Sequence, residues 1–371
     1  MNVQNTIEFP FVKKIILCLL FPFLFLLLKE NIMCRYSDNT WQDSVRFLGR
    51  YYSDYDGVWF DYTCSGIEFD YKSEGNGKIT VDFVADDIYA NDPKRMAWVG
   101  VYINDDNEPY EVFPLDNYKV TKTIYENDHR ETLKIKIIKL SEAKYGRMEI
   151  SALNVMGGDI TPTLEKEMKI ELIGDSITCG HGDETTRYDE FTTRTENGYM
   201  TYGAILAREL NADVNIIAYS GLGVWHSTDS TEPLKALEIY NWISPFNKQM
   251  WNFDSYVPDY IIINLGTNDS RFIKSEDEKK QFREAYECFI RQIMIKNNNA
   301  EIICTVGPMN YDTEEIIEEI VSTFDSEQVH FFTFSSMRSE NDFGTGNHPT
   351  LVKHNEMFNE LYDFFKMNML Q

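Results

Sequence analysis

Four short segments of the chain carry the chemical groups that ester hydrolysis requires. They lie, in chain order, at residues 174–178, 220–223, 266–269 and 347–349. Together they offer a serine hydroxyl as the nucleophile, three donors for a developing oxyanion, and an imidazole as the general base. Each segment alone is weak evidence, but the four in this order predict an ester hydrolase with a serine nucleophile.

Ser176 is the predicted nucleophile, because it follows an apolar run at the point where the chain should turn into a helix. Backbone N–H groups at such a turn can stabilise negative charge. The competing interpretation is a serine that simply caps a helix. The segment is not the G-x-S-x-G elbow of the α/β hydrolases, because Ile177 and Thr178 follow the serine.

The predicted oxyanion donors are the backbone N–H groups of Ser176 and Gly221 and the side-chain amide of Asn268. A glycine lets its N–H approach a substrate oxygen without obstruction. Losing one such donor typically costs about 10²–10³ in turnover. Taken alone, Gly221 would be a turn glycine and Asn268 an Asx turn. The neighbouring Asp269 is expected to order the loop.

His348 is the predicted general base, because it follows the last predicted strand and should return to the same sheet edge as Ser176. His181 and His226 lie in loops that could line the site. The sequence contains no His-x-His or His-x-x-x-His pair. We therefore expect neither a metal site nor any other cofactor.

The elements that must position these groups form an α/β domain in the second half of the chain. Apolar strands are expected at residues 169–174, 214–219, 260–265, 301–306 and 329–334. The segments between them show apolar stripes at helical spacing, with Ser275 and Thr350 as caps. This alternation predicts three layers around a mostly parallel sheet. Such sheets bind ligands beyond the carboxyl ends of their strands, where all four segments fall.

The first half of the chain predicts an antiparallel β-sandwich. Short runs of β-branched and aromatic residues recur at 65–71, 78–83, 96–103, 119–124, 132–139 and 147–155. Turn residues separate them, as at 74–77, and no long helical pattern interrupts the series. A Gly/Pro/Thr segment at 157–163 marks the expected boundary. We therefore predict a sandwich domain at 41–158 and a hydrolase domain at 166–371.

Composition narrows the class of substrate and partner. The formal net charge of the 371-residue chain is −25, and the acidic residues are spread along it. This argues against nucleic acid and anionic membrane surfaces as partners. It fits a neutral substrate such as a sugar, and it equally fits solubility alone. The six cysteines form no CxxC pair, so no disulfide framework is expected, and Cys288 and Cys304 should be core residues.

The N-terminal segment has the pattern of a secretory signal. Lys13 and Lys14 precede an apolar run at residues 15–28, which is short for a membrane span. No small-x-small cleavage site follows, so residues 1–33 are either a signal peptide or an uncleaved membrane anchor. We favour a secreted or membrane-anchored extracellular protein. A translation start at Met33 would instead make the protein cytoplasmic.

The catalytic segments resemble those of the SGNH or GDSL-type hydrolases, whose blocks contribute Ser, Gly, Asn and His. More narrowly, the chain resembles carbohydrate esterase family 2, which joins an N-terminal jelly-roll sandwich to an SGNH domain. Residues 48–50 and 64–69 look like the start of that sandwich. Residues 173–180 and 263–269 look like that family's catalytic blocks. The resemblance covers nearly everything after Trp41.

This resemblance assigns the four family roles to Ser176, Gly221, Asn268 and His348. It implies an enzyme that removes acetyl groups from plant-type polysaccharides or oligosaccharides through an acetyl-enzyme intermediate. We expect a monomer, although the sequence leaves the oligomeric state open. The polysaccharide and the hydroxyl position stay open. Two alternatives are a lipase or thioesterase on the same scaffold and a catalytically silent sugar-binding protein. Trp225 and Trp251 are candidates for stacking on a sugar ring, with core packing as the alternative for Trp225.

One departure from the family pattern concerns the acid that orients the histidine. SGNH enzymes often place an Asp three residues before the His, and some esterases of this family place one two residues before it. Those positions are Thr345 and Gly346 in this chain. Family members with a Ser–His dyad are known, so we expect a dyad. Either a backbone carbonyl or Asp342, the nearest acid upstream, then orients His348.

Overall fold

The computed structural model describes residues 41–228, 234–324 and 326–370. The segment interpreted as a signal peptide or anchor, residues 1–33, lies outside them. Contacts divide the chain after Asp43, and the fold described below is that of the unit that begins at Ser44. Among the described residues, no helix has the length and hydrophobicity needed to cross a bilayer.

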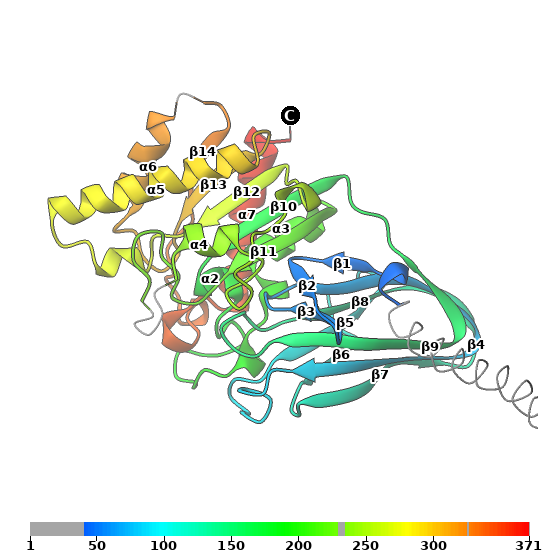
Figure 1. Ribbon diagram of the computed structural model, residues 1–371. Coiled ribbons are helices and arrows are strands. Elements are labelled where there is room, and N and C mark those ends of the chain that lie inside the picture. The colour runs from blue at the N-terminus through cyan, green and yellow to red at the C-terminus, as the bar shows by residue number, and fades with distance from the viewer. Residues whose placement is uncertain (1–40, 229–233, 325, 371) are drawn as a thin grey trace, which may run out of the picture. The chain divides into compact units, whose positions relative to one another are not determined.

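Nine antiparallel strands build the first domain of this unit (Figure 1). The hydrogen-bonded order is β2-β3-β9-β4-β8-β5-β6, with β1 and β7 also paired to β4. The strands are β1 (Arg46–Leu48), β2 (Tyr51–Ser53), β3 (Val58–Phe60), β4 (Gly66–Ala85), β5 (Trp98–Ile103), β6 (Glu111–Pro114), β7 (Lys119–Asn127), β8 (Arg130–Lys139) and β9 (Met148–Pro162). The predicted antiparallel β domain is confirmed.

The long strand β4 replaces two strands and a turn that the sequence predicted between residues 65 and 83. Gly75 and Asn76 have positive φ angles of 101° and 54°. The chain nevertheless continues through them, and its register against β9 shifts between Ser73 and Lys78. β4 pairs with β8 before this irregularity and with β7 after it. The turn residues at 74–77 therefore mark a change of partner strand.

The strand β9 continues through the segment that the sequence interpreted as a domain boundary. Residues 158–162 pair with β4 as far as the pair Phe69 and Pro162. The parallel sheet begins at Met168. The change from antiparallel to parallel strands thus falls between Pro162 and Met168.

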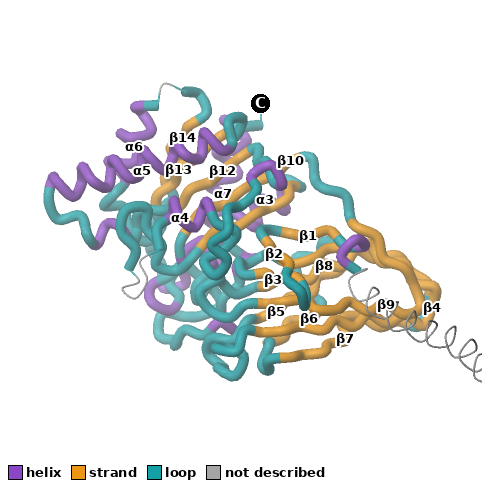
Figure 2. Tube along the Cα trace, in the orientation of Figure 1, coloured by secondary structure: helices purple, strands orange, loops and turns teal. Residues whose placement is uncertain are grey.

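Five parallel strands in the order β11-β10-β12-β13-β14 form the second sheet (Figure 2). They are β10 (Met168–Gly174), β11 (Ala212–Ala218), β12 (Tyr260–Asn264), β13 (Glu301–Val306) and β14 (Val329–Thr333), and each overlaps a predicted strand. Gly174 pairs with Ala218 on one side and with Asn264 on the other. The carboxyl ends of these three strands therefore meet at one edge of the sheet.

Helices cover both faces of the parallel sheet, as the prediction requires. They are α2 (Ser176–Cys179), α3 (Tyr202–Glu209), α4 (Ala236–Asn241), α5 (Glu276–Lys296), α6 (Glu314–Thr323) and α7 (Leu351–Asn368). Ile261 and Ile263 of β12 pack in a core with α5 and α6, whereas Ile262 packs in a second core with α3 and α7. This alternation follows from the period of a strand, which points successive side chains to opposite faces.

The predicted helix starts and cysteine positions have mixed outcomes. Ser275 and Thr350 cap α5 and α7 by accepting the backbone N–H of the residue three positions on. Cys304 is buried as predicted. Cys288 is exposed, so its assignment to the core is wrong, because the apolar stripe of α5 uses the neighbouring Phe289 instead.

Short 3-10 helices occupy several of the connecting segments. They are Gln42–Ser44, Thr193–Thr195, Gly198–Met200, Phe253–Ser255, Asp269–Arg271, Glu340–Asp342 and Thr345–Asn347. Asp269–Arg271 and Thr345–Asn347 matter most for function, since they adjoin two of the four segments that the sequence singled out.

Candidate active site

The predicted nucleophile lies on a one-turn helix directly after β10. Asp175 caps this helix, with its carboxylate accepting the Ile177 N–H at 3.0 Å. Gly180 ends it with a φ of 81°. A side chain at Gly174 would place its Cβ 2.0 Å from the Thr178 hydroxyl oxygen, so the turn requires glycine there. The Gly-Asp-Ser sequence thus fixes where the Ser176 hydroxyl points.

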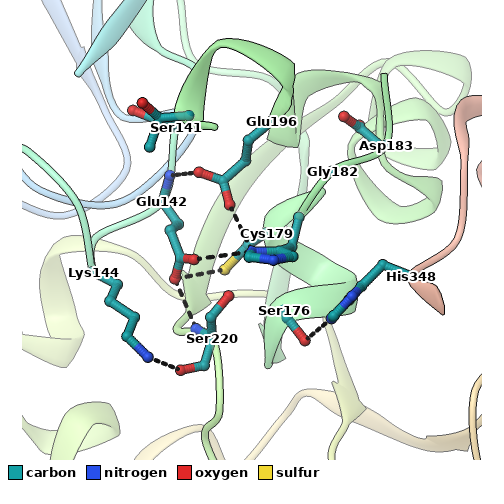
Figure 3. A network of polar contacts seen from close by, with 12 residues as sticks. Ser141, Glu142, Lys144, Ser176, Cys179, Gly182, Asp183, Glu196, Ser220 and His348 are labelled. Atoms are coloured by element: carbon teal, nitrogen blue, oxygen red, sulfur yellow. Dashed lines mark hydrogen bonds and ion pairs between the residues drawn. The ribbon is translucent and has the colours of Figure 1, made fainter. Parts of the chain in front are cut away.

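Ser176 and His348 meet although 172 residues separate them in the chain. The His348 Nε2 lies 2.8 Å from the Ser176 Oγ (Figure 3). The loop that carries the histidine is tied to the segment after the nucleophile, because the Thr345 N–H donates to the Thr185 hydroxyl at 2.8 Å. The Leu351 N–H likewise donates to the Asp183 carbonyl at 3.0 Å. The geometry of a hydroxyl beside an imidazole is that of an activated nucleophile.

A backbone carbonyl faces the other ring nitrogen of His348. The Nδ1 lies 3.2 Å from the Thr345 carbonyl oxygen, which can only accept a hydrogen bond. This contact favours the tautomer with hydrogen on Nδ1, leaving Nε2 free to accept the serine proton. Gly346 and Asn347 both have a φ of 61°, and this tight turn brings the carbonyl back to the ring.

Asp342, the alternative orienting acid, is engaged elsewhere. Its carboxylate accepts the N–H groups of Arg338 and Ser339 at 2.6 and 2.9 Å, and the Ser339 hydroxyl at 3.0 Å. It therefore caps the 3-10 helix Glu340–Asp342. The suggestion that Asp342 orients His348 is wrong, because its local backbone partners hold the carboxylate.

Burial makes His348 a base that stays neutral at ordinary pH. It lowers the pKa of His348 to about 3, and the nearby His181 acts in the same direction. The two ring centroids lie 4.5 Å apart. We expect kcat/KM for a soluble acetyl ester to stay level as the pH falls through 6.5. Its acid limb should have a midpoint well below that value, since this profile reports the base of the free enzyme.

The fold must be followed by circular dichroism at each pH of that profile. A buried histidine with a lowered pKa binds fewer protons than in the unfolded chain, so folded stability falls as the pH drops below about 6.5. An acid limb centred near 6.5 in a fully folded protein would contradict the expectation.

Gly221 and Asn268 lie at the same sheet edge as Ser176. Gly221 follows β11 and has a φ of 88°, a conformation that favours glycine. The Asn268 amide donates to the Asp175 carboxylate and to the Leu222 carbonyl, both at 2.9 Å. It thereby bridges the loops that follow β10 and β11. Both amide hydrogens are thus taken in this structure, which differs from the predicted free oxyanion donor.

Asp269 orders the loop after β11, as predicted. Its carboxylate is fully buried and accepts three consecutive N–H groups. They come from Val224, Trp225 and His226 at 3.0, 2.8 and 2.7 Å. These bonds compensate for the burial of the carboxylate and hold the segment that carries Gly221.

The two tryptophans proposed for sugar stacking lie in different environments. Trp225 belongs to the loop after β11, where its ring is half-buried beside the His226 ring at 4.2 Å. Trp251 packs under the guanidinium of Arg50 at 5.0 Å. It lines a hollow with Lys169 and Asp213, at the amino ends of β10 and β11. Its assignment to the substrate site is therefore wrong, because that edge is opposite Ser176.

Sequence reasoning missed a buried polar cluster beside the nucleophile. The Nδ1 of His181 lies 3.7 Å from a Glu142 carboxylate oxygen and 3.8 Å from one of Glu196. Among the described residues, this is the one group that could hold a metal ion. Both glutamates are buried, and Lys139 beside them donates to the Glu142 carbonyl at 2.6 Å. A charged residue within the apolar end of β8 is the signal that could have pointed to this cluster.

Comparison with known proteins agrees with this geometry. Residues 172–350 match the GDSL-like Lipase/Acylhydrolase family. This part of the chain is a GDSL-like domain. The matched range includes all four predicted segments up to and beyond His348.

Relatives of the chain include two curated bacterial proteins. Cellulase/esterase CelE of Acetivibrio thermocellus is 34% identical over 233 residues, which cover 60% of this chain but 28% of CelE. An acetylxylan esterase/glucomannan deacetylase of Cellvibrio japonicus is 27% identical over 273 residues, which cover 71% of this chain and 75% of that protein. The chain thus spans well under half the length of CelE.

A solved structure supports the same relationship over both domains of the chain. It is a family two carbohydrate esterase from Clostridium thermocellum in complex with cellohexaose. It superposes with a TM-score of 0.78 at 28% identity, covering 87% of this chain and 98% of that one. The resemblance to carbohydrate esterase family 2 that the sequence suggested is confirmed.

Proposed function

We propose that this protein is a carbohydrate O-deacetylase that hydrolyses acetyl esters of polysaccharides or oligosaccharides through a Ser–His dyad. The observation that carries the proposal is the 2.8 Å contact between the Ser176 Oγ and the His348 Nε2, with the Thr345 carbonyl behind the ring. The named relatives of the chain, an acetylxylan esterase/glucomannan deacetylase and CelE, support the substrate class.

In the first half of the reaction, His348 takes the proton of Ser176 as the serine oxygen attacks the acetyl carbonyl carbon. The carbonyl oxygen becomes an oxyanion, and the N–H groups of Ser176 and Gly221 stabilise it. The imidazolium donates from Nδ1 to the Thr345 carbonyl. It then protonates the departing sugar oxygen from Nε2, which leaves an acetyl-enzyme on Ser176.

In the second half, a water molecule attacks the acetyl-enzyme with His348 again as the base. The same donors hold the second oxyanion, and acetate leaves as Ser176 recovers its proton. Asn268 can join the oxyanion donors only by giving up one of its two present acceptors. Its main role in this proposal is to hold the Ser176 and Gly221 loops together.

The test is acetate release by the full chain from acetylated xylan, glucomannan and cello-oligosaccharides, compared with long-chain acyl esters. We expect the acetylated carbohydrates to give the highest kcat/KM. Preference for long acyl chains would indicate a lipase instead. Saturable carbohydrate binding without acetate release would indicate a silent binding protein, and either result would overturn the proposal.

Trp225 is proposed to stack on the sugar ring next to the acetyl group. Changing Trp225→Ala should raise KM for an acetylated oligosaccharide about 2- to 10-fold, which corresponds to a typical aromatic contact. It should leave KM for a small acetate ester without a sugar unchanged. Steady-state kinetics on the two substrates measure this difference.

Trp251→Phe is the matched control for Trp225→Ala, because Trp251 packs against Arg50 at the opposite edge. We expect a lower Tm and an unchanged KM for both substrates. Equal effects of the two substitutions on the oligosaccharide would contradict the placement of the sugar over Trp225.

The proposed location is outside the cell, by secretion or by an N-terminal anchor. The apolar run after Lys13 and Lys14 supports export, as does the polymeric nature of the proposed substrate. Fractionation of cells that express the full chain, followed by N-terminal sequencing of the mature protein, tests the location and shows whether the segment is cleaved.

A further inference from the structure

A segment of the β domain reaches the loop that carries Gly221. This segment, residues 141–144, connects β8 to β9. Glu142 accepts the Ser220 N–H at 2.7 Å, and the Lys144 Nζ donates to the Ser220 carbonyl at 3.3 Å (Figure 3). Ser220 is the residue directly before Gly221. Both polar groups of its backbone are therefore held by side chains from the other domain.

The Lys144 contact sets the direction of the Gly221 N–H. The Ser220 carbonyl and the Gly221 N–H belong to one planar peptide unit and point in opposite directions. Fixing the carbonyl oxygen therefore fixes the N–H. An ammonium on the carbonyl also polarises the peptide unit, which makes its N–H a better hydrogen-bond donor. Glycine needs such support, because its backbone is otherwise free to rotate.

Glu142 anchors the same loop and also contacts the nucleophile helix. Its carboxylate has no exposure to solvent and faces the Cys179 thiol at 3.7 Å, at the last residue of α2. Burial would raise the pKa of Glu142, but the contacts from His181 and Ser220 hold it below its ordinary value. One carboxylate thus links the helix that begins with Ser176 to the loop that presents Gly221.

We propose that Glu142 and Lys144 are positioning residues that aim the Gly221 N–H at the reaction oxyanion. The β domain is then part of the catalytic apparatus, because it acts through the Ser220–Gly221 peptide unit. This inference rests on the proposed function, because it gives a role to the oxyanion donor of that reaction.

The central variants are Lys144→Met, which removes the ammonium but keeps the length of the side chain, and Glu142→Gln. Lys144→Met should lower kcat about 10- to 100-fold, less than the complete loss of a donor. Its KM should change less than threefold. A boronic acid that forms a tetrahedral adduct with Ser176 should lose affinity by the same factor as kcat. Lys144→Arg, which keeps a cationic donor, should recover most of the lost activity.

Glu142→Gln retains one acceptor for the Ser220 N–H, so we expect a smaller loss of kcat than in Glu142→Ala. The matched controls are Lys134→Met and Glu68→Gln. In wild type, the Lys134 ammonium of β8 pairs with the Asp105 carboxylate at 2.6 Å, and Glu68 is a buried carboxylate of β4. Both controls should keep kcat within twofold of wild type, even where Tm falls.

Three outcomes would overturn the inference. One is an unchanged kcat in Lys144→Met. Another is a loss of kcat that follows the folded fraction while boronate affinity stays constant, which would indicate a structural role. The third is wild-type activity that EDTA abolishes and zinc restores, which would make Glu142, His181 and Glu196 metal ligands. An inert wild type would refute the proposed function itself, so the two failures are distinguishable.

Discussion

Replacing Ser176 with alanine is expected to lower kcat for acetate release by roughly 10⁴-fold or more. The substitution removes the Oγ that lies 2.8 Å from the His348 Nε2, so no acetyl-enzyme can form. KM should change little, because the alanine leaves the sugar-binding surface intact. Acetate release measures the first effect. Intact-protein mass spectrometry after rapid quenching tests for the acetyl-enzyme, which wild type alone should form.

Ser65→Ala controls for the loss of a buried hydroxyl. Ser65 is fully buried in the β domain, where its hydroxyl donates to the Tyr62 carbonyl. We expect this variant to lose stability and to retain the wild-type kcat per folded molecule. If Ser176→Ala kept more than a few per cent of wild-type turnover, Ser176 would not be the nucleophile and the proposed mechanism would fail.

Much of the second domain could be predicted because its sequence signals are local. Continuous apolar runs such as residues 260–264, bounded by turn signals, are typical of strands covered on both faces, and parallel strands bring their carboxyl ends together. The sequence therefore predicted that the segments holding Ser176 and His348 would meet. The loop-ordering role of Asp269 was also predictable, since a buried Asp at a strand end must accept hydrogen bonds from nearby backbone N–H groups.

The details that the sequence did not reveal depend on backbone geometry or on packing between distant segments. Gly346 and Asn347 both adopt positive φ angles, and the turn they form brings the Thr345 carbonyl to His348. The sequence allowed a backbone carbonyl in this role but did not identify which one. The Gly-Asn-Gly run at 75–77 has the composition of a hairpin turn, yet β4 continues through it as an irregularity. Local composition does not distinguish these two outcomes.

Glu142 and Trp251 show how contacts between domains escape sequence analysis. Trp251 has a residue type suited to sugar stacking, but Arg50 from the β domain covers it. Glu142 matched no catalytic motif, yet it contacts the loop next to the proposed oxyanion donor. In both cases the deciding partner lies far away in the chain, in the other domain. The motifs therefore predict least well those residues that make contacts between the two domains.

Replacing His348 with alanine should lower kcat by about as much as replacing Ser176, because nucleophile and base act as one unit. The remaining rate should rise with pH, since hydroxide can take the serine proton in place of the imidazole. The double variant Ser176→Ala/His348→Ala should be no slower than either single variant. Steady-state acetate release between pH 6 and pH 10 measures these rates.

Two further variants separate a dyad from a triad and from general damage to the fold. His354→Asn removes another buried histidine, which contacts the Tyr202 N–H at 3.4 Å, and it should cost stability with kcat retained. Asp342→Asn should change kcat only a few-fold, because the Asp342 carboxylate holds Arg338 and Ser339 rather than His348. In serine proteases the equivalent change at the orienting Asp costs about 10⁴ in kcat. A loss of that size in Asp342→Asn would show that Asp342 approaches the imidazole during turnover, and the Thr345 carbonyl would lose the orienting role assigned to it.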